Sequence, residues 1–243
     1  MTPAIRGTAA GTRARVTETL AWLERKGSKR NRDGMARYGI VAKKVFGVSV
    51  GDLRAHGKRV GRDHALALAL WRTGWYEARM LAAFVDDPAE VTRAQMDLWA
   101  RAFDNWAICD TICFHLFDKT PHAWAKIAKW APSEHEFVKR AAFALIASIG
   151  VHDKSAPDAQ FIRALRLIER AATDDRNFVK KGVSWALRVI GRRNAVLHQR
   201  ALLVAEKLRA SETPAARWIG SDASRELSSA KVRRIVASRA ARQ

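Results

Sequence analysis

An aspartate, an arginine and two tryptophans stand in segments whose spacing would let them act together on a nucleic acid. Trp106 and Asp110 are four residues apart in Trp-Ala-Ile-Cys-Asp, Arg140 follows in Phe-Val-Lys-Arg, and Trp185 lies in Ser-Trp-Ala-Leu-Arg. All three segments have helical spacing, so Trp106 and Asp110 lie one turn apart on the same side of a helix. Tryptophan normally belongs in a core, and a carboxylate facing a polyanion weakens binding. An Asp that shares a helix face with Trp in a strongly basic chain therefore predicts chemistry on a nucleic acid.

The charge of the chain indicates the kind of partner. Its 243 residues contain 44 Lys and Arg against 24 Asp and Glu, which gives a formal net charge of +20 and a pI near 11.0. Such a balance favours nucleic acid or an anionic membrane surface and argues against a solenoid that binds only proteins. Because 48% of the residues are hydrophobic, the chain is expected to fold rather than stay disordered.

Secretion and membrane insertion are not indicated. The longest apolar runs, such as residues 65–71, are too short to span a bilayer, and residues 1–6 contain no apolar signal-peptide core. The two cysteines, Cys109 and Cys113, share one helical face and suit a reducing compartment. We expect a cytoplasmic, nucleoid-associated monomer that binds duplex DNA and no membrane.

The elements that position these residues are predicted to be helices throughout, because no segment alternates apolar and polar residues as a strand does. Ser133 with Glu136 resembles a capping box, and Thr120-Pro121 puts proline at a helix start. Gly74, Gly150 and Gly191 are candidate helix ends. The helices are expected at residues 12–26, 31–46, 50–58, 62–73, 75–85, 89–102, 104–117, 121–130, 134–149, 157–172, 175–190, 194–209 and 222–238.

A repeated sequence motif, called the echo below, predicts how these helices pack. Phe-Val-Lys-Arg at 137–140 and Phe-Val-Lys-Lys at 178–181 are nearly identical, 41 residues apart, and each opens a helix. A period near forty with two helices per unit is typical of HEAT-like repeats. We therefore predict an all-α fold, a right-handed α-solenoid with a concave basic groove lined by every second helix. Residues 31–210 form the repeat domain, between an N-terminal helical segment (1–30) and a C-terminal basic helical segment (211–243).

In that scheme Trp106, Asp110, Arg140 and Trp185 lie on successive inner helices and converge on the groove. Basic side chains cluster near the starts of neighbouring inner helices and just after Gly191, and helix N-termini with Lys or Arg bind phosphates well. These residues are expected to hold the backbone of duplex DNA: Lys139, Arg140, Lys180, Lys181, Arg192 and Arg193.

The same residues resemble the DNA alkylation repair family of HEAT-like-repeat glycosylases. The resemblance runs from Met35-Ala-Arg-Tyr38 through Trp106 and Asp110 to Arg140 and Trp185, covers roughly residues 31–195, and is poor after Gly191. It implies an all-α solenoid that excises positively charged N3- and N7-alkylated purines without flipping the base and without a cofactor. Asp110 would be the catalytic carboxylate, flanked by Trp106 and Trp185 at the deoxyribose. Arg140 would hold the backbone near the lesion, and Tyr38 would line the cleft.

Elementary chemistry agrees with those implied roles. A cationic purine is a good leaving group, and cleavage of its glycosidic bond gives the sugar oxocarbenium character that a carboxylate stabilises. The alternative is a HEAT-like protein that binds nucleic acid without cleaving it, in which both tryptophans belong to the core and Asp110 forms a surface ion pair. Cys109, Cys113 and His115 lack a second ligand pair at zinc spacing, so no metal site is expected.

Overall fold

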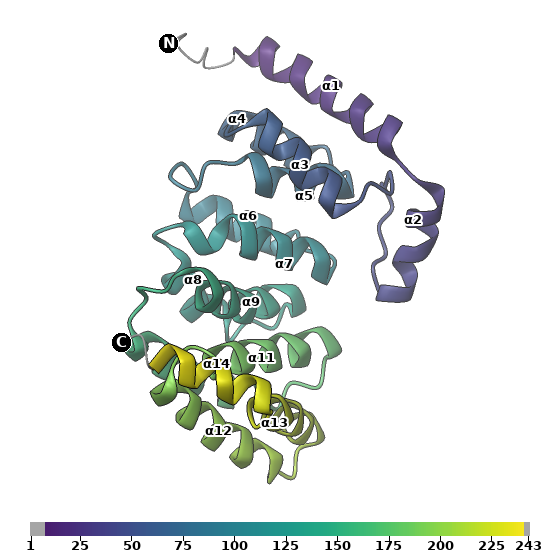
Figure 1. The fold of residues 1–243 in the computed structure, drawn as a ribbon. Coiled ribbons are helices and arrows are strands. Elements are labelled where there is room, and N and C mark those ends of the chain that lie inside the picture. Colours follow the sequence, from purple (N-terminus) through teal and green to yellow (C-terminus); the bar gives the residue numbers. More distant parts are fainter. Residues whose placement is uncertain (1–7, 241–243) are drawn as a thin grey trace. The chain divides into compact units, whose positions relative to one another are not determined.

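The computed structural model describes residues 8–240, and all regular structure in this range is helical (Figure 1). Fourteen α-helices and two short 3-10 helices follow one another, without a strand among the described residues, which confirms the all-α prediction. None of the described helices is long and apolar enough to cross a membrane. Residues 1–6, on which the signal-peptide argument rests, lie outside the described range.

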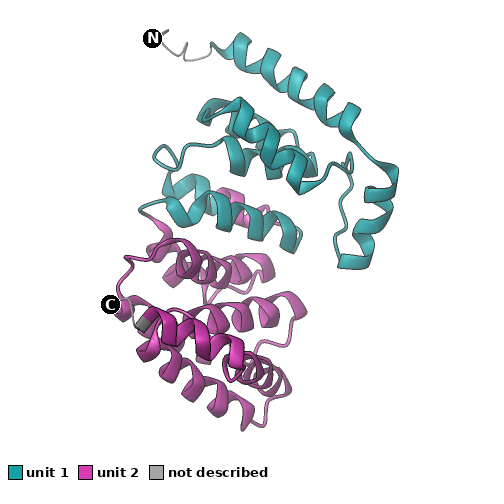
Figure 2. Ribbon diagram, viewed as in Figure 1, with its two compact units in different colours: residues 1–97, 104–121 teal, residues 98–103, 122–243 magenta. Residues whose placement is uncertain are grey.

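The chain divides into two compact units (Figure 2). The first unit holds the residues up to Asp97 together with Asp104–Pro121, and the second holds Leu98–Phe103 together with the residues from His122 onward. The chain crosses between the units three times, first inside α6 (Arg93–Arg101).

The first unit is built around α5, which packs against α3, α4 and α7. α5 is buried along most of its length, and Leu66, Leu70, Met80 and Leu81 form the centre of this core. The elements of the unit, apart from α6, are α1 (Ala9–Lys26), α2 (Lys29–Met35), η1 (Ala36–Tyr38), α3 (Val50–Val60), α4 (His64–Arg72), α5 (Tyr76–Val85), α7 (Trp106–His115) and η2 (Phe117–Lys119).

The second unit consists of helix pairs. Its elements are α8 (Ala123–Trp130), α9 (Glu136–His152), α10 (Asp158–Ala171), α11 (Asn177–Ile190), α12 (Ala195–Arg209), α13 (Pro214–Leu227) and α14 (Ala230–Ala240). The second helices of the pairs, α9, α11 and α13, pack on one another in sequence, and α10 packs on α12 (Figure 1). Alternate helices therefore form separate layers, as HEAT-like repeats require.

The echo predicted at 137–140 and 178–181 is a structural repeat. α9 begins at Glu136 and α11 at Asn177, so both echoes occupy the same place in their helices. The rings of Phe137 and Phe178 are in contact, with centroids 5.5 Å apart. The two copies thus stack directly on each other.

The helix predicted at 31–46 is wrong beyond Tyr38. Gly39 takes a left-handed conformation (φ 68°), which ends the helical path. The residues from Ile40 to Ser49 are not helical. Three of their amides are satisfied in another way: the buried carboxylate of Glu77 accepts hydrogen bonds from the amides of Phe46, Gly47 and Val48. A side chain from α5 thus replaces helical hydrogen bonds, which local spacing could not reveal.

The helix predicted at 222–238 is two helices. α13 begins with Pro214 at its first position, and the helix is interrupted at Ser228-Ser229 before α14 begins. The hydroxyl of Ser229 accepts a hydrogen bond from the amide of Val232, which caps the new helix.

Three predicted helix boundaries also move. Ser133 does not form the capping box, because α9 starts after His135 and the Ser133 hydroxyl accepts from the His135 amide. α8 starts at Ala123, beyond Thr120-Pro121. Gly150 lies inside α9, where a Cβ would be only 2.6 Å from Cγ1 of Val189, so its small size serves close packing of α9 on α11. Gly74 (φ 73°) and Gly191 do follow helix ends as predicted.

Candidate active site and nucleic-acid interface

The Trp106–Asp110 pair is positioned by the cap of α7. Asn105 is buried, and its side-chain oxygen accepts a hydrogen bond from the amide of Ile108 at 3.0 Å. This cap makes Trp106 the first residue of α7 and places Asp110 one turn later. Both side chains are partly exposed. A carboxylate and an indole therefore lie on the same, partly exposed side of α7.

The opposite side of α7 is core. Ile108, Cys109, Ile112 and Cys113 are fully buried. Burial, and next the hydrogen bond with Cys109, raise the pKa of the Cys113 thiol well above its usual value; the nearby Asp110 charge acts in the same direction. Among the described residues no cluster of three or more His, Cys, Asp or Glu side chains could hold a metal ion.

Trp106 ties α7 to the turn that carries Tyr38. Its indole N–H donates a hydrogen bond to the carbonyl oxygen of Tyr38 at 2.8 Å, across 68 residues of sequence. The Tyr38 side chain itself is 69% exposed. The structure thus brings Trp106 into contact with the Tyr38 turn within the first unit, and Asp110 lies one turn further along α7.

Arg140 lies in the second unit and is buried, with only 6% of its surface exposed. Its guanidinium donates to the carbonyl oxygen of Phe178 at 2.6 Å, in the first turn of α11. Gly182 of α11 makes room for the side chain, because a Cβ there would be 3.4 Å from Cγ of Arg140. Arg140 therefore fixes α11 against α9, and its sequence-predicted phosphate contact would have to be made from this position.

Lys139 is bound to an acidic partner. Its Nζ lies 2.8 Å from Oδ2 of Asp174 in the loop between α10 and α11. Asp174 also binds the guanidinium of Arg176 at 2.6 and 2.9 Å. The hydrogen bonds from Arg176, and then those from Lys139, hold the pKa of the Asp174 carboxyl far below its usual value. This cluster clamps the loop to the start of α9.

Trp185 stands in a row of basic side chains on α11. Lys181, Trp185 and Arg188 recur at helical spacing on α11, and Arg192 continues the row in the turn after Gly191; we call these four residues the α11 ridge. Lys181 is exposed and has no charged or hydrogen-bonding partner among the described residues. Trp185 is partly exposed between Lys181 and Arg188.

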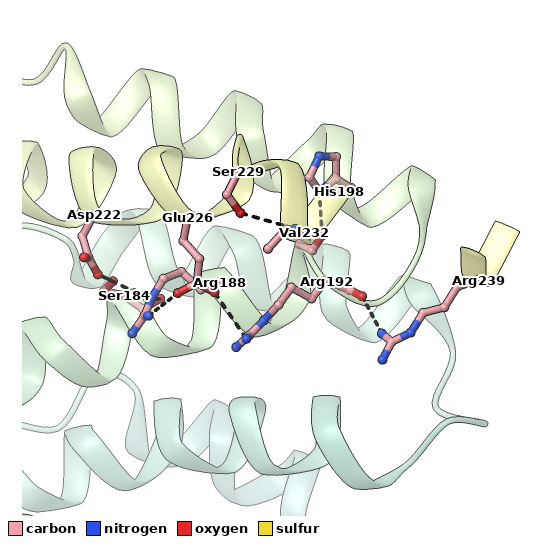
Figure 3. A network of polar contacts seen from close by, with 10 residues as sticks. Ser184, Arg188, Arg192, His198, Asp222, Glu226, Ser229, Val232 and Arg239 are labelled. Atoms are coloured by element: carbon pink, nitrogen blue, oxygen red, sulfur yellow. Dashed lines mark hydrogen bonds and ion pairs between the residues drawn. The ribbon is translucent and has the colours of Figure 1, made fainter. Parts of the chain in front are cut away.

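Carboxylates of α13 orient the two arginines of the ridge (Figure 3). Glu226 lies 2.5 Å from Arg188 and 3.3 Å from Arg192. Asp222 lies 3.4 Å from Arg188 and also accepts a hydrogen bond from the hydroxyl of Ser184. The arginines are therefore held in place, but part of their charge is compensated.

Lys180 and Arg193 have different surroundings. Nζ of Lys180 lies 5.0 Å from the ring centroid of Trp218, a half-exposed residue of α13. Arg193 donates to the carbonyl oxygens of Gly150, Asp153 and Ala156 at 2.8–3.1 Å. Burial lowers the pKa of the Arg193 guanidinium. Its contacts hold the α9–α10 connection, so the predicted phosphate contact of Arg193 is replaced by a structural role.

The sequence analysis did not assign two residues that help to form the site. Arg188 lies three residues after Trp185 in the same Trp-x-Leu-Arg motif, and its spacing alone could have assigned it to the ridge. Asn105 directly precedes Trp106, and an Asn before a helical run is a recognisable cap.

Comparison with known proteins agrees with a helical-repeat protein that acts on DNA. A family model described as "DNA alkylation repair enzyme" matches residues 19–227, which extends past the 31–195 range of the resemblance. The sequence finds no match among curated proteins.

One solved structure is described as "A new family of proteins related to the HEAT-like repeat DNA glycosylases with affinity for branched DNA structures". It aligns with a TM-score of 0.72 at 19% identity and covers 86% of this chain and 94% of its own. At that identity the likeness shows the fold, a HEAT-like helical repeat, and not the activity. The family match, by contrast, spans most of the sequence, and the chain belongs to the DNA alkylation repair enzyme family.

Proposed function

We propose that this protein is a DNA glycosylase that removes positively charged N3- or N7-alkylated purines from duplex DNA. The observation that carries the proposal is the pairing of Asp110 with Trp106 on the partly exposed side of α7, in a chain of the alkylation repair family. A carboxylate in a chain of charge +20 has a specific use when the group it meets is a developing cation.

The chemistry follows from the cationic base. When the bond from C1′ to the purine nitrogen breaks, its electron pair neutralises the charge on the base, which leaves without an acid to protonate it. The sugar becomes oxocarbenium-like, and the Asp110 carboxylate stabilises that charge and orients water for attack on C1′. The water loses a proton to solvent, and the products are the free base and an abasic sugar. The indole of Trp106 favours the polarised C–H groups of the sugar.

The second unit contributes contacts to the DNA backbone in this proposal. Lys181 offers an unpaired charge, Lys180 stands beside an indole, and Arg188 and Arg192 are held by carboxylates of α13. Such contacts position a duplex but carry no sequence information.

The decisive experiment compares wild type with Asp110→Asn on duplex DNA that contains 7-methylguanine, under single-turnover conditions. We expect the variant to fold and bind DNA but to release the base about ten- to a thousandfold more slowly. Glu90→Gln, an exposed carboxylate-to-amide change elsewhere in the first unit, is the matched control and should keep full activity. Uracil, a neutral base, should not be released by any of the three proteins.

A second function has support from one observation. The solved structure of similar fold is described as having affinity for branched DNA and as belonging to a family related to the glycosylases. If wild type binds duplex DNA but releases no alkylated base, this chain is a DNA-binding protein without glycosylase activity.

A further inference from the structure

A hollow of about 860 Å³ opens in the first unit beside Tyr38. Its floor is apolar and aromatic, with Ile40, Val48 and Tyr76 almost fully buried. Its rim carries cations from α2 and η1. Pockets of roughly 300–1,000 Å³ with an apolar lining and a few polar groups are typical of sites for small organic ligands. The hollow is therefore large enough for one nucleotide.

The walls of the hollow are held rigidly. The carboxylate of Glu77 binds the amides of Phe46, Gly47 and Val48, at 2.6 Å in the case of Gly47. Asn31 of α2 donates to the carbonyl of Gly47 at 2.9 Å, and a Cβ at Gly47 would clash with the carbonyl oxygen of Ser28. Helix α2 is thus anchored on the 46–48 segment. A preformed site of this kind loses little conformational entropy when a ligand binds.

The rim offers two arginines with no partner among the described residues. Arg30 and Arg37 are exposed and seven residues apart, so they follow one side of α2 and η1. Gly34 lies between them, and a Cβ there would meet no atom within 4 Å. Lys29, by contrast, is paired with Asp33 at 2.8 Å. The hollow therefore presents unpaired guanidinium groups, which suit phosphate, next to the Tyr38 ring, which suits a base.

We propose that this hollow binds a single DNA nucleotide that has left the base stack, with Arg30 and Arg37 at its phosphate and the Tyr38 ring against its base. The proposal rests on the proposed DNA-binding function and deepens it by naming a second substrate feature, an unpaired nucleotide. The hydrogen bond from Trp106 to Tyr38 connects the hollow to the helix that carries Asp110. The unstacked nucleotide is a neighbour of the alkylated nucleotide, which by the family resemblance stays in the base stack while its base is released.

The test measures the affinity of the full-length protein for a duplex with one bulged nucleotide and for the same duplex without it. Stacking of one base on an aromatic ring predicts about tenfold tighter binding of the bulged DNA. Two variants should abolish this preference and leave most of the affinity for the paired duplex: Gly34→Leu, which fills open space, and Arg30→Gln combined with Arg37→Gln.

The matched control is Arg54→Gln combined with Lys58→Gln, which removes two exposed cations from α3 outside the hollow. This double variant should keep the preference. Folding of each variant is checked by its thermal unfolding. Because Gly34 is helical and surrounded by open space, Gly34→Leu is expected to fold.

The proposal is overturned if wild type binds both DNAs equally, or if Gly34→Leu keeps the preference. It is also overturned if Gly34→Leu removes binding of a free deoxynucleotide while wild type binds bulged DNA no more tightly than paired DNA. Asp110→Asn should retain the preference for bulged DNA, so loss of glycosylase activity and loss of this site are separate outcomes. Absence of binding to either DNA would defeat the DNA-binding function itself.

Discussion

The indole of Trp106 has two separable roles, as a ring beside Asp110 and as a hydrogen-bond donor to Tyr38. Trp106→Phe keeps an aromatic ring but removes the donor. We expect Trp106→Phe to slow base release by a few fold, because one hydrogen bond contributes about 1 kcal/mol. Trp106→Ala should slow it further, and both should remain more active than Asp110→Asn.

Amide hydrogen exchange separates the two roles. Exchange at residues 38–40 should accelerate in Trp106→Phe and Trp106→Ala alike, since both lose the contact with the Tyr38 carbonyl. If Trp106→Phe exchanges like wild type but is as slow in base release as Trp106→Ala, the hydrogen bond has no part in positioning this turn.

For individual residues, the sequence predicted part of the candidate site. The i, i+4 spacing of Trp106 and Asp110 was sufficient, because α7 is a regular helix and its period fixes their common face. The partners of the basic residues could not be predicted. Lys139 meets Asp174 and Arg193 meets carbonyls about forty residues earlier in the chain, and such long-range pairs depend on how the helix pairs stack.

The loop between α10 and α11 gives a pH prediction. The pKa of Asp174 is lowered in the folded protein, so this carboxylate stabilises the fold above its unfolded pKa of about 3.9. The stabilisation is lost as the pH falls through the lower, folded value. Asp174→Asn should therefore be less stable than wild type at pH 7, and the difference in unfolding free energy should shrink below about pH 4.

Asp33→Asn is the control for that series. Its carboxyl pKa is also lowered, first by the hydrogen bond from Lys29, but this pair lies on the surface of α2. Exposed ion pairs contribute little to stability. A pH dependence of equal size in both variants would contradict the assignment of Asp174 as a clamp.

Close contact between α12 and α13 gives a second prediction for an element. A Cβ at Gly220 would lie 2.3 Å from the amide nitrogen of Arg209 and 2.5 Å from the carbonyl oxygen of Ala205. These are backbone atoms, so the helices must separate, and Gly220→Ala should destabilise the protein by about 1–3 kcal/mol. Gly34→Ala, in open space, should be neutral or stabilising by up to about 1 kcal/mol. Denaturant unfolding of both variants tests the contrast.

Helices with a continuous apolar face were predictable from the sequence. The segments where the predicted helix is not observed lack such a local signal. α10 and α11 have a strong apolar side and were placed to within a few residues. Residues 40–46 were assigned to a helix, but the conformation of this segment is set by Glu77, thirty residues away from Gly47. The break at Ser228-Ser229 interrupts a pattern that is helical on both sides.

For the whole molecule, the charge of +20 predicts DNA binding that is independent of sequence and steeply dependent on salt. Lys181→Gln should reduce the slope of log K against log salt by about 0.9, because one phosphate contact is lost. Lys139→Gln removes the same charge from a lysine that is already paired, so it should alter stability more than the slope. Equal slopes for wild type and Lys181→Gln would remove Lys181 from the interface.

The burial of both cysteines has a consequence for the stability of this protein toward alkylating reagents. Agents that alkylate purines also attack thiolates, so an enzyme acting on their lesions is exposed to the same electrophiles. The chain has only two cysteines, both are inaccessible in the core of α7, and the raised pKa of Cys113 keeps it in the unreactive thiol form. The protein should therefore outlast a pulse of methylating reagent that consumes exposed cellular thiols. Under the proposed function, it would then be intact when alkylated bases are most abundant.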